Sequence, residues 1–171
     1  MGFTIEEFDL TFDMIELAAK DAESLGKLNN SITEGEGNRA GFLGEQIVMK
    51  WCRSHGIEVE RANTYDYDLI CRKDGRSITV DVKTKRRNVA PQMYFDASIC
   101  AKNIGQSTDR YVFAQVNPTN SGYIYGWMPK KEYFEKAIFH KKGEYDSTND
   151  WHFRQDCYNL SYAKLYPMSS F

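Results

Sequence analysis

Long hydrophobic runs are missing from this 171-residue chain. No stretch of about 18 consecutive apolar residues occurs, so no membrane-spanning helix is predicted and no membrane is expected as a partner. The first seven residues are mostly acidic or apolar and lack the basic-then-apolar order of a secretory signal peptide. The composition, 42% hydrophobic and 27% charged, is ordinary for a globular protein. We therefore expect a globular protein of the cytoplasm.

Cysteine and histidine are scarce, and neither is arranged as a metal site. The four cysteines are widely spaced without a Cys-x-x-Cys pair, so reduced thiols are expected and a zinc site is not. The three histidines show no metal-binding spacing. His140, Asn149 and His152 have the residue types of a His-Asn-His nuclease finger. The flanking sequence lacks the strand-turn-helix pattern that such a finger needs, so we do not predict one.

An excess of basic charge is also missing, since the formal net charge is −2. Taken alone, this value argues weakly against a nucleic-acid partner. The charge is unevenly distributed, however: residues 1–27 contain seven acidic and two basic residues, whereas residues 28–171 contain 17 acidic and 20 basic residues. The acidity therefore belongs to the N-terminal segment, and the rest of the chain is mildly basic.

The acidic N-terminal segment is predicted to be an amphipathic helix. Thr4-Ile5-Glu6-Glu7 has the form of a capping box, and apolar residues follow at steps of three and four until Gly26. A polar, glycine-bearing stretch over 28–38 is predicted to be a linker. We therefore divide the chain into residues 1–37, a helix and linker, and residues 38–171, the main domain. The apolar stripe could pack on that domain or on a second copy, which leaves a homodimer open.

The main domain is predicted to combine helices with a sheet. In chain order we predict a helix over 39–55, strands over 57–61, 65–71 and 78–84, a short helix over 96–103, strands over 109–117 and 123–128, and a helix over 129–139. The first three strands form an antiparallel meander with an Asp74-Gly75 turn. The fourth is reached by a crossover and is expected to run parallel to the third. The tyrosine-rich C-terminal stretch is expected to fold back over the sheet.

Two charged residues on the third strand of this meander suggest a site. Asp81 and Lys83 are two positions apart, so they share one face of the strand while their neighbours point to the core. A carboxylate beside an ammonium group can hold a divalent cation and orient a water molecule, although a solvated ion pair is the commoner outcome. Asp68 on the second strand can lie beside Asp81, and two adjacent carboxylates repel each other unless a cation lies between them.

Three features nearby bear on this site. Asp66 lies on the same predicted face as Asp68 and is a rival for its role; we prefer Asp68 because two apolar strand residues directly follow it. Glu45 lies at the edge of the apolar stripe of helix 39–55, where a half-buried functional acid or an ordinary border residue could sit. Gly41 and Gly44 are poor helix formers, so their presence in this helix suggests that something approaches its backbone closely.

A short basic run continues the strand that carries Asp81. Lys85, Arg86 and Arg87 follow Lys83, so four of five consecutive residues are basic. Such a run is usually a solvated edge. Here it would flank the candidate site where a phosphate backbone would run, which makes Lys85, Arg86 and Arg87 candidate nucleic-acid-binding residues.

These pieces, taken in order, resemble the PD-(D/E)xK superfamily of restriction-endonuclease-like nucleases. They are Gly44-Glu45 on a helix, Tyr67-Asp68-Leu69-Ile70 on a strand and Asp81-Val82-Lys83-Thr84 on the next strand. The resemblance covers roughly residues 39–117 and implies an α/β fold with an α-β-β-β-α-β core, in which helices flank a mixed central sheet. Residues 126–130 are similar to a segment of small phage and bacterial members.

The chain departs from the family pattern at two positions. Tyr67 precedes Asp68 where the motif name has a proline, and Asp81 stands where glutamate is commoner. Aspartate is one methylene shorter, which constrains the placement of a metal but keeps the oxygen ligand. Many family members lack the proline, so neither departure removes the predicted site.

The resemblance implies Mg²⁺-dependent hydrolysis of DNA, with Mn²⁺ as a substitute. Asp68, Asp81 and the carbonyl of Val82 would coordinate the cation, and Glu45 would join them directly or through a water molecule. Lys83 would position or deprotonate the attacking water and stabilise the charged transition state. By the same analogy, the product would carry a 5′-phosphate.

One further residue and several alternatives complete the prediction. Gln115 matches a glutamine often seen on the fourth strand of the family, where it could hold the water or a phosphate; a structural amide is equally compatible. With no evident target-reading domain, we favour structure-selective cutting in repair, recombination or phage DNA processing, in a bacterial or phage-infected cell. Cleavage of RNA at the same site is one alternative, and a non-catalytic module that binds nucleic acid or protein is another.

Overall fold

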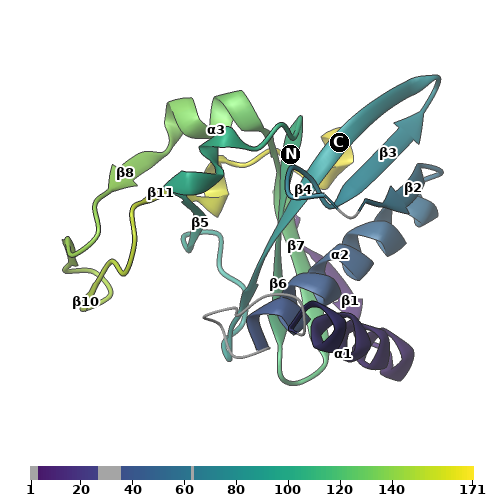
Figure 1. Ribbon diagram of the computed structural model, residues 1–171, viewed down its shortest axis with the longest axis horizontal. Coiled ribbons are helices and arrows are strands. Elements are labelled where there is room, and N and C mark those ends of the chain that lie inside the picture. Colours follow the sequence, from purple (N-terminus) through teal and green to yellow (C-terminus); the bar gives the residue numbers. More distant parts are fainter. Residues whose placement is uncertain (1–3, 27–35, 63) are drawn as a thin grey trace.

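The computed structural model of the protein describes residues 4–26, 36–62 and 64–171. It is a mixed α/β fold around a six-stranded sheet with the strand order β1-β7-β6-β4-β3-β2 (Figure 1). The strands are β1 (Glu6–Asp9), β2 (Glu58–Arg61), β3 (Leu69–Lys73), β4 (Arg76–Arg86), β6 (Arg110–Asn117) and β7 (Ser121–Pro129). β4 and β6 run parallel, and the other neighbouring strands run antiparallel. The predicted fold class, an antiparallel meander continued by a parallel strand, is confirmed.

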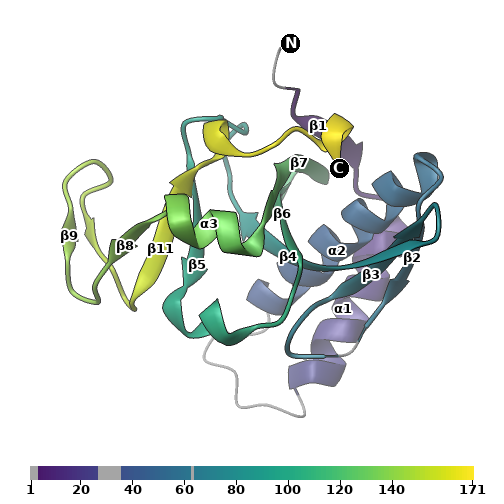
Figure 2. The same ribbon diagram turned by 90° about the horizontal axis from the view of Figure 1, so that it is seen from above.

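Different elements cover the two faces of this sheet (Figure 2). On one face α2 (Glu36–Ser54) packs on the sheet, and α1 (Phe12–Gly26) packs beside α2. On the other lie α3 (Lys130–Lys136) and a small sheet with the order β5-β11-β8. The small sheet consists of β5 (Asp96–Cys100), β8 (Ile138–His140) and β11 (Cys157–Ser161), and a hairpin of β9 (Tyr145–Asp146) and β10 (Trp151–His152) joins β8 to β11. Short 3-10 helices are η1 (Ala101–Gly105), η2 (Tyr162–Lys164) and η3 (Met168–Ser170).

A separate hydrophobic core fills the space on each side of the central sheet. On the helix side, Ile47 of α2 packs with Val80 and Val82 of β4. On the other side, Tyr111 of β6 packs with Tyr133 of α3 and with the small sheet. Alternate residues of β4 therefore face different environments, as the two-residue period of a strand requires. In the described ranges no helix is long and apolar enough to cross a membrane.

The β3–β4 hairpin fixes which residues of these strands face each other. Asp74 and Gly75 have φ values of 52° and 74°, so both turn residues are left-handed, as expected for the predicted Asp-Gly hairpin. The turn pairs Lys73 with Arg76, and the register continues to the pair Leu69 and Val80. The residue before Leu69 is therefore brought next to the middle of β4.

α2 approaches β4 closely at one glycine. A Cβ atom added to Gly44 would lie 1.8 Å from Thr84 Oγ1, which is far too close for two atoms that are not bonded to each other. The predicted close approach is therefore confirmed for Gly44. It is wrong for Gly41, where an added Cβ would meet nothing within 4 Å. The contact places the residue after Gly44, Glu45, beside the central sheet.

The N-terminal segment differs from its prediction. Glu6–Asp9 is a strand that pairs with β7, and the helix begins only at Phe12. Its first turn is capped by Thr11, whose Oγ1 accepts a hydrogen bond from the backbone N–H of Met14 at 3.3 Å. The capping box at Thr4 was therefore wrong, because the open edge of β7 offers backbone partners that local sequence does not reveal. The division of the chain at residue 37 stays a prediction; of the predicted linker, residues 28–35 lie outside the described residues and 36–38 begin α2.

The helix predicted over 96–103 is also different. Asp96–Cys100 is the strand β5, paired with β11, and only Ala101–Gly105 forms a short 3-10 helix. Ala97 and Ile99 alternate into the core on this strand. The partner strand is nearly sixty residues away in the chain, so local periodicity could not reveal the pairing. The connection between β4 and β6 thus carries a strand of the small sheet in place of a core α-helix.

Candidate active site

The site forms at the N-terminal end of β3, at the limit of its pairing with β4. The last pair of the ladder is Leu69 with Val80, and the backbone N–H of Asp68 still donates to the carbonyl of Val80 at 3.0 Å. Beyond this pair no β3 backbone faces β4, and the Asp68 side chain supplies the acceptor instead. Its Oδ2 accepts a hydrogen bond from the N–H of Val82 at 2.7 Å. The Asp68 carboxylate is therefore fixed at the point where the two strands separate.

Asp81 and Lys83 lie next to this carboxylate, on β4. The Lys83 Nζ is 2.5 Å from Asp81 Oδ2, and the Asp81 residue is only 4% exposed. Asp81 Oδ2 nevertheless accepts no hydrogen bond of good geometry from any described residue. The Lys83 ammonium group also lies 5.6 Å from the centre of the Tyr111 ring, a cation–π contact. The predicted sharing of one strand face by Asp81 and Lys83 is thus confirmed.

Three carboxyl groups act on one another here. Burial raises the pKa of Asp68 to about 8; the charges of Asp81 and Glu45 raise it as well, and the Val82 N–H acts in the opposite direction. Burial also raises the pKa of Glu45 to about 7, although Arg61 opposes this shift. The site therefore holds more buried carboxyl groups than the positive charges beside it can keep ionised at neutral pH.

Glu45 reaches this region from α2 and is held by Arg61. The Nε of Arg61 is 3.2 Å from Glu45 Oε2, and its Nη1 is 2.8 Å from Asp21 Oδ2 of α1. Arg61 thus joins α1, α2 and the end of β2. The sequence prediction missed this residue, which gave no signal beyond its place at the end of a short strand.

Oxygen atoms at this site suit a hard divalent cation. The N–H and C=O of one strand residue point to the same side, so the Val82 carbonyl points, like its N–H, toward the gap that β3 leaves. Together with the Asp68 and Asp81 carboxylates it forms a set of oxygen donors of the kind that Mg²⁺ prefers. The pKa of Asp68, raised by burial and by the charges of Asp81 and Glu45, indicates a place that lacks positive charge. These residues fit the cation.

Glu45 is not part of that donor set in this arrangement. Within the described ranges, no three carboxylate, imidazole or thiol side chains lie close enough together to hold one ion. The ion pair with Arg61 keeps the Glu45 carboxylate on the α2 side. Of the two roles predicted for it, contact through a water molecule agrees better with this geometry than direct coordination.

Asp66, the rival acid, has a different position. Its Oδ1 accepts a hydrogen bond from the backbone N–H of Ser107 at 3.1 Å, so it tethers the connection that leads to β6. Asp68, by contrast, faces Val82 of β4. The structure therefore brings Asp68, and not Asp66, to Asp81.

Of the two roles predicted for Gln115, the structural amide agrees better with its hydrogen bonds than contact with a water molecule or a phosphate. Its Oε1 accepts a 2.5 Å hydrogen bond from the hydroxyl of Tyr125, and its Nε2 donates to the Val89 carbonyl at 2.8 Å and to Asn117 Oδ1 at 2.7 Å. The side chain is fully buried. Both N–H donors of the amide are used and the side chain is buried, so Gln115 fastens the segment after β4 to β6 and β7.

The basic run after the site is divided between the two faces of β4. Lys83, Lys85 and Arg87 line a cleft of about 1130 Å³ between the central sheet and the segment that carries β8 to β10. Arg86 lies on the opposite face and is exposed. Lys85 Nζ donates to the Asp96 carbonyl at 3.0 Å, and burial lowers the pKa of Lys85 to about 8. Only two of the three predicted nucleic-acid-binding residues therefore face the same space as Lys83.

Comparison with known proteins gives distant structural matches. The chain matches no protein-family model and no curated protein sequence. Its fold is similar to the structure of Hjc, a Holliday junction resolvase from Archaeoglobus fulgidus, with a TM-score of 0.44, 10% identity and coverage of 76% of this chain and 93% of that one. It is also similar to the bacterial homing endonuclease I-Ssp6803I, with a TM-score of 0.40, 17% identity and coverage of 56% and 67%. Both are nucleases. At these TM-scores the matches carry no conclusion about activity, which depends on the residues of the site.

Proposed function

We propose that this protein is a Mg²⁺-dependent nuclease that hydrolyses phosphodiester bonds in DNA with a PD-(D/E)xK-type site. The observation that supports this most directly is the arrangement of Asp68, Asp81 and Lys83. Two carboxylates, one directly before β3 and one on β4, meet beside one ammonium group, and the Asp81 side chain, ion-paired with Lys83, is almost completely buried. A solvated surface ion pair would show neither this burial nor the second carboxylate.

The donor atoms have defined roles in this proposal. Asp68, Asp81 and the Val82 carbonyl would hold the cation, and Glu45 would act through a water molecule. When bound, Mg²⁺ supplies Lewis-acid activation of the phosphate and of a water molecule. Mn²⁺ would substitute, because it also accepts oxygen ligands.

Lys83 orients the reacting groups. Its ammonium group, held by Asp81, can donate to a water molecule beside the scissile phosphate and offset the negative charge that develops on the phosphoryl oxygens. The water oxygen forms a bond to phosphorus as the bond from phosphorus to the 3′-oxygen breaks. One proton of the water ends on the 3′-oxygen, so the products carry a 3′-hydroxyl and a 5′-phosphate.

Cleavage of supercoiled and branched DNA with Mg²⁺, with Mn²⁺ and with EDTA tests this function. Removing one charge-stabilising donor typically costs on the order of 100- to 1,000-fold in rate, and we expect a loss of this size for Lys83→Ala. Lys50→Ala is the matched control, since Lys50 is an exposed lysine of α2 outside the site. Calorimetric titration with Mn²⁺ should show binding by the wild-type protein that Asp81→Asn abolishes.

The outcomes separate the alternatives. Cleavage that ignores both the metal and Lys83 would overturn the proposal. DNA binding without any turnover would instead favour a non-catalytic module on the same fold. Faster cleavage of an RNA of matched sequence in a parallel assay would assign the site to RNA.

A further inference from the structure

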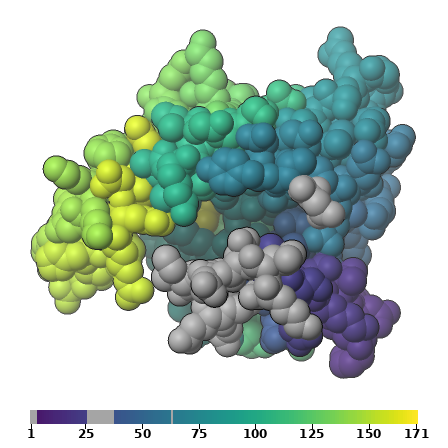
Figure 3. All heavy atoms as spheres, in the orientation of Figure 1, coloured from purple at the N-terminus to yellow at the C-terminus, as the bar shows by residue number. Residues whose placement is uncertain are grey.

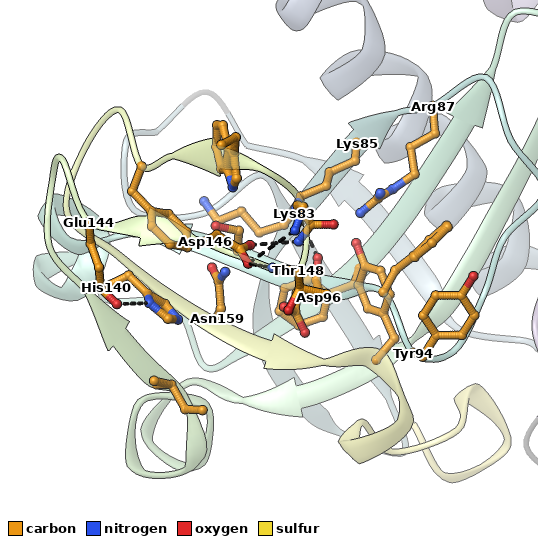
Figure 4. Close-up of a pocket in the computed structure, with 18 of the residues that line it drawn as sticks. Lys83, Lys85, Arg87, Tyr94, Asp96, His140, Glu144, Asp146, Thr148 and Asn159 are labelled. Atoms are coloured by element: carbon orange, nitrogen blue, oxygen red, sulfur yellow. Dashed lines mark hydrogen bonds and ion pairs between the residues drawn. The ribbon is translucent and has the colours of Figure 1, made fainter.

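The cleft beside the candidate active site is built from two unlike walls (Figure 4). One wall is the end of β4, and the other comes from the segment before β5 and from the β8–β10 region. In Figure 3 the lobe formed by residues near 140–160 stands beside the body of the molecule, and the surface is hollowed between them. The cleft begins at Lys83, so it is continuous with the site where the phosphodiester bond would be cut.

The β4 wall carries a row of positive charge. Lys83 and Lys85 of β4 and Arg87 directly after it occupy alternate positions of an extended backbone, which spaces them by about 6.6 Å along one face. Lys85 uses one of its three N–H donors on the Asp96 carbonyl. The Nε of Arg87 is buried and has no hydrogen-bond partner, while its guanidinium group lies 4.4 Å from the centre of the Phe95 ring. Lys85 therefore keeps two N–H donors for phosphate oxygens, and the guanidinium group of Arg87 places a second positive charge beside them.

Exposed aromatic rings occupy the opposite wall. Tyr94, Tyr145 and Trp151 line the cleft and are 74%, 53% and 42% exposed. They come from three different segments: Tyr94 directly precedes β5, Tyr145 is in β9 and Trp151 is in β10. Large exposed rings that gather in one cleft usually mark a binding surface, and a nucleobase stacks well on such rings because every base has a π face.

The acidic residues of the cleft limit where a phosphate can lie. Glu144 accepts hydrogen bonds from His140 and from the N–H of Lys141, and Asp146 accepts them from Thr148 and Asn149, so both carboxylates stabilise the β8–β10 turns. Asp96 lies between the two walls, beside Lys85. A bound strand would therefore keep its phosphates on the β4 side and turn its bases toward the aromatic side.

We propose that this cleft binds an unpaired segment of a DNA strand, with phosphates on Lys85 and Arg87 and bases stacked on Tyr94, Tyr145 and Trp151. This inference builds on the proposed nuclease function and specifies its substrate as DNA with a single-stranded part. The size of the cleft is compatible with this: cavities of about 300–1,000 Å³ enclose one drug-sized molecule, so 1130 Å³ has room for a few nucleotides. The exposed rings favour an unpaired strand, because the bases of a duplex are already stacked on one another.

Fluorescence anisotropy with labelled 12-nucleotide oligomers in EDTA tests the inference without any cleavage. We expect the single strand to bind at least tenfold more tightly than a duplex of the same length and sequence. Equal or tighter binding of the duplex would overturn the proposal. Tighter binding of a single-stranded RNA of the same sequence would overturn the assignment to DNA.

Substitutions in the aromatic wall test the stacking contribution. Tyr94→Ala should weaken single-strand binding by about 5- to 150-fold, the range expected for the loss of one base-stacking contact, whereas Tyr94→Phe should retain it. Phe12→Ala is the matched control, because Phe12 is an equally exposed ring, at 78%, on α1. If Tyr94→Ala binds like the wild-type protein, the stacking wall is refuted.

The salt dependence tests the basic wall. Lys85→Ala should reduce the slope of log affinity against log salt concentration by about 0.7, the value for one phosphate contact on a single strand. Arg86→Ala, its neighbour on the other face of β4, should leave that slope unchanged. An unchanged slope in Lys85→Ala would contradict the predicted path of the phosphates.

Tryptophan fluorescence reports on the same site independently. Trp51 and Trp127 are buried, so quenching by an added oligomer should come from Trp151. The quenching should disappear in Trp151→Phe, and if it persists, Trp151 does not contact the strand. Cleavage with Mg²⁺ but without single-strand preference would refute this inference alone. Single-strand binding without cleavage at any metal concentration would refute the nuclease function and leave the cleft assigned to binding.

Discussion

The carboxyl cluster of Asp68, Asp81 and Glu45 at the N-terminal end of β3 should make the metal-free protein less stable as the pH rises. In the folded protein the pKa of Asp68 is about 8, whereas an aspartate in an unfolded chain has a pKa of about 3.9. Between these values the folded protein keeps a proton that the unfolded chain releases. The stabilisation from this proton is therefore fully present below pH 4 and is lost progressively as the pH rises to 8.

The size of this effect follows from the difference in pKa. A difference of about four pH units corresponds to on the order of 5 kcal/mol for an isolated group, at 1.36 kcal/mol per unit. The charges of Asp81 and Glu45 contribute to this shift, so Asp68 is not an isolated group and 5 kcal/mol is an upper bound. Asp68→Asn should keep the acceptor for the Val82 N–H but carry no titrating proton. The variant should therefore lose much of the pH dependence and be more stable than the wild-type protein at pH 8.

Urea unfolding followed by circular dichroism, in EDTA at pH 5, 6, 7 and 8, measures the effect. Asp66→Asn is the matched control, because Asp66 is two residues away but tethers Ser107 outside the cluster. Addition of Mg²⁺ at pH 8 should restore stability to the wild-type protein by about 2.7 kcal/mol at 100 times the dissociation constant. The same addition should not stabilise Asp68→Asn.

Two results would refute this reasoning. One is a wild-type stability that stays flat or increases between pH 5 and pH 8 in EDTA. The other is an Asp68→Asn variant whose profile follows the wild-type profile. Either result would mean that the Asp68 carboxyl is charged in the folded metal-free protein, so that the positive charge nearby already balances the cluster.

Three further predictions concern residues around the site. Gly44→Ala should destabilise the protein by about 1–3 kcal/mol in urea unfolding, because the added Cβ would collide with Thr84 of β4. Gly41→Ala in the same helix should instead stabilise it by up to about 1 kcal/mol, and equal effects of the two substitutions would contradict the close approach at Gly44. Arg61→Ala should raise the pKa of Glu45 above 7, since an attractive charge and a hydrogen bond are lost, and a carboxyl ¹³C NMR titration would detect the change. Gln115→Ala should lower the free energy of unfolding by about 1–3 kcal/mol, because the buried hydroxyl of Tyr125 loses its acceptor. A loss of cleavage at unchanged stability would instead favour a catalytic role for Gln115.

The sequence by itself determined the local parts of the site. The alternation of β4 put Asp81 and Lys83 on one face, because side chains of a strand repeat every two residues. The Asp74-Gly75 pair determined the hairpin, because aspartate and glycine tolerate the left-handed conformation that both turn positions require. Gly44 signalled a close approach to the helix backbone, which the structure shows to be made by Thr84 of β4. Each of these inferences needs only residues that are close in the chain.

Tertiary structure decided what depends on distant partners. The segment at Glu6–Asp9 became a strand because the open edge of β7 accepts it, and Asp96–Cys100 became a strand because β11 pairs with it. The buried hydroxyl of Tyr125 gives Gln115 a structural partner. Asp68, and not Asp66, reaches β4, because its carboxylate accepts from Val82 at the point where the β3–β4 pairing begins. Local periodicity is blind to such partners, because hydrogen-bond and packing partners that are far apart in the chain become neighbours only in the folded protein.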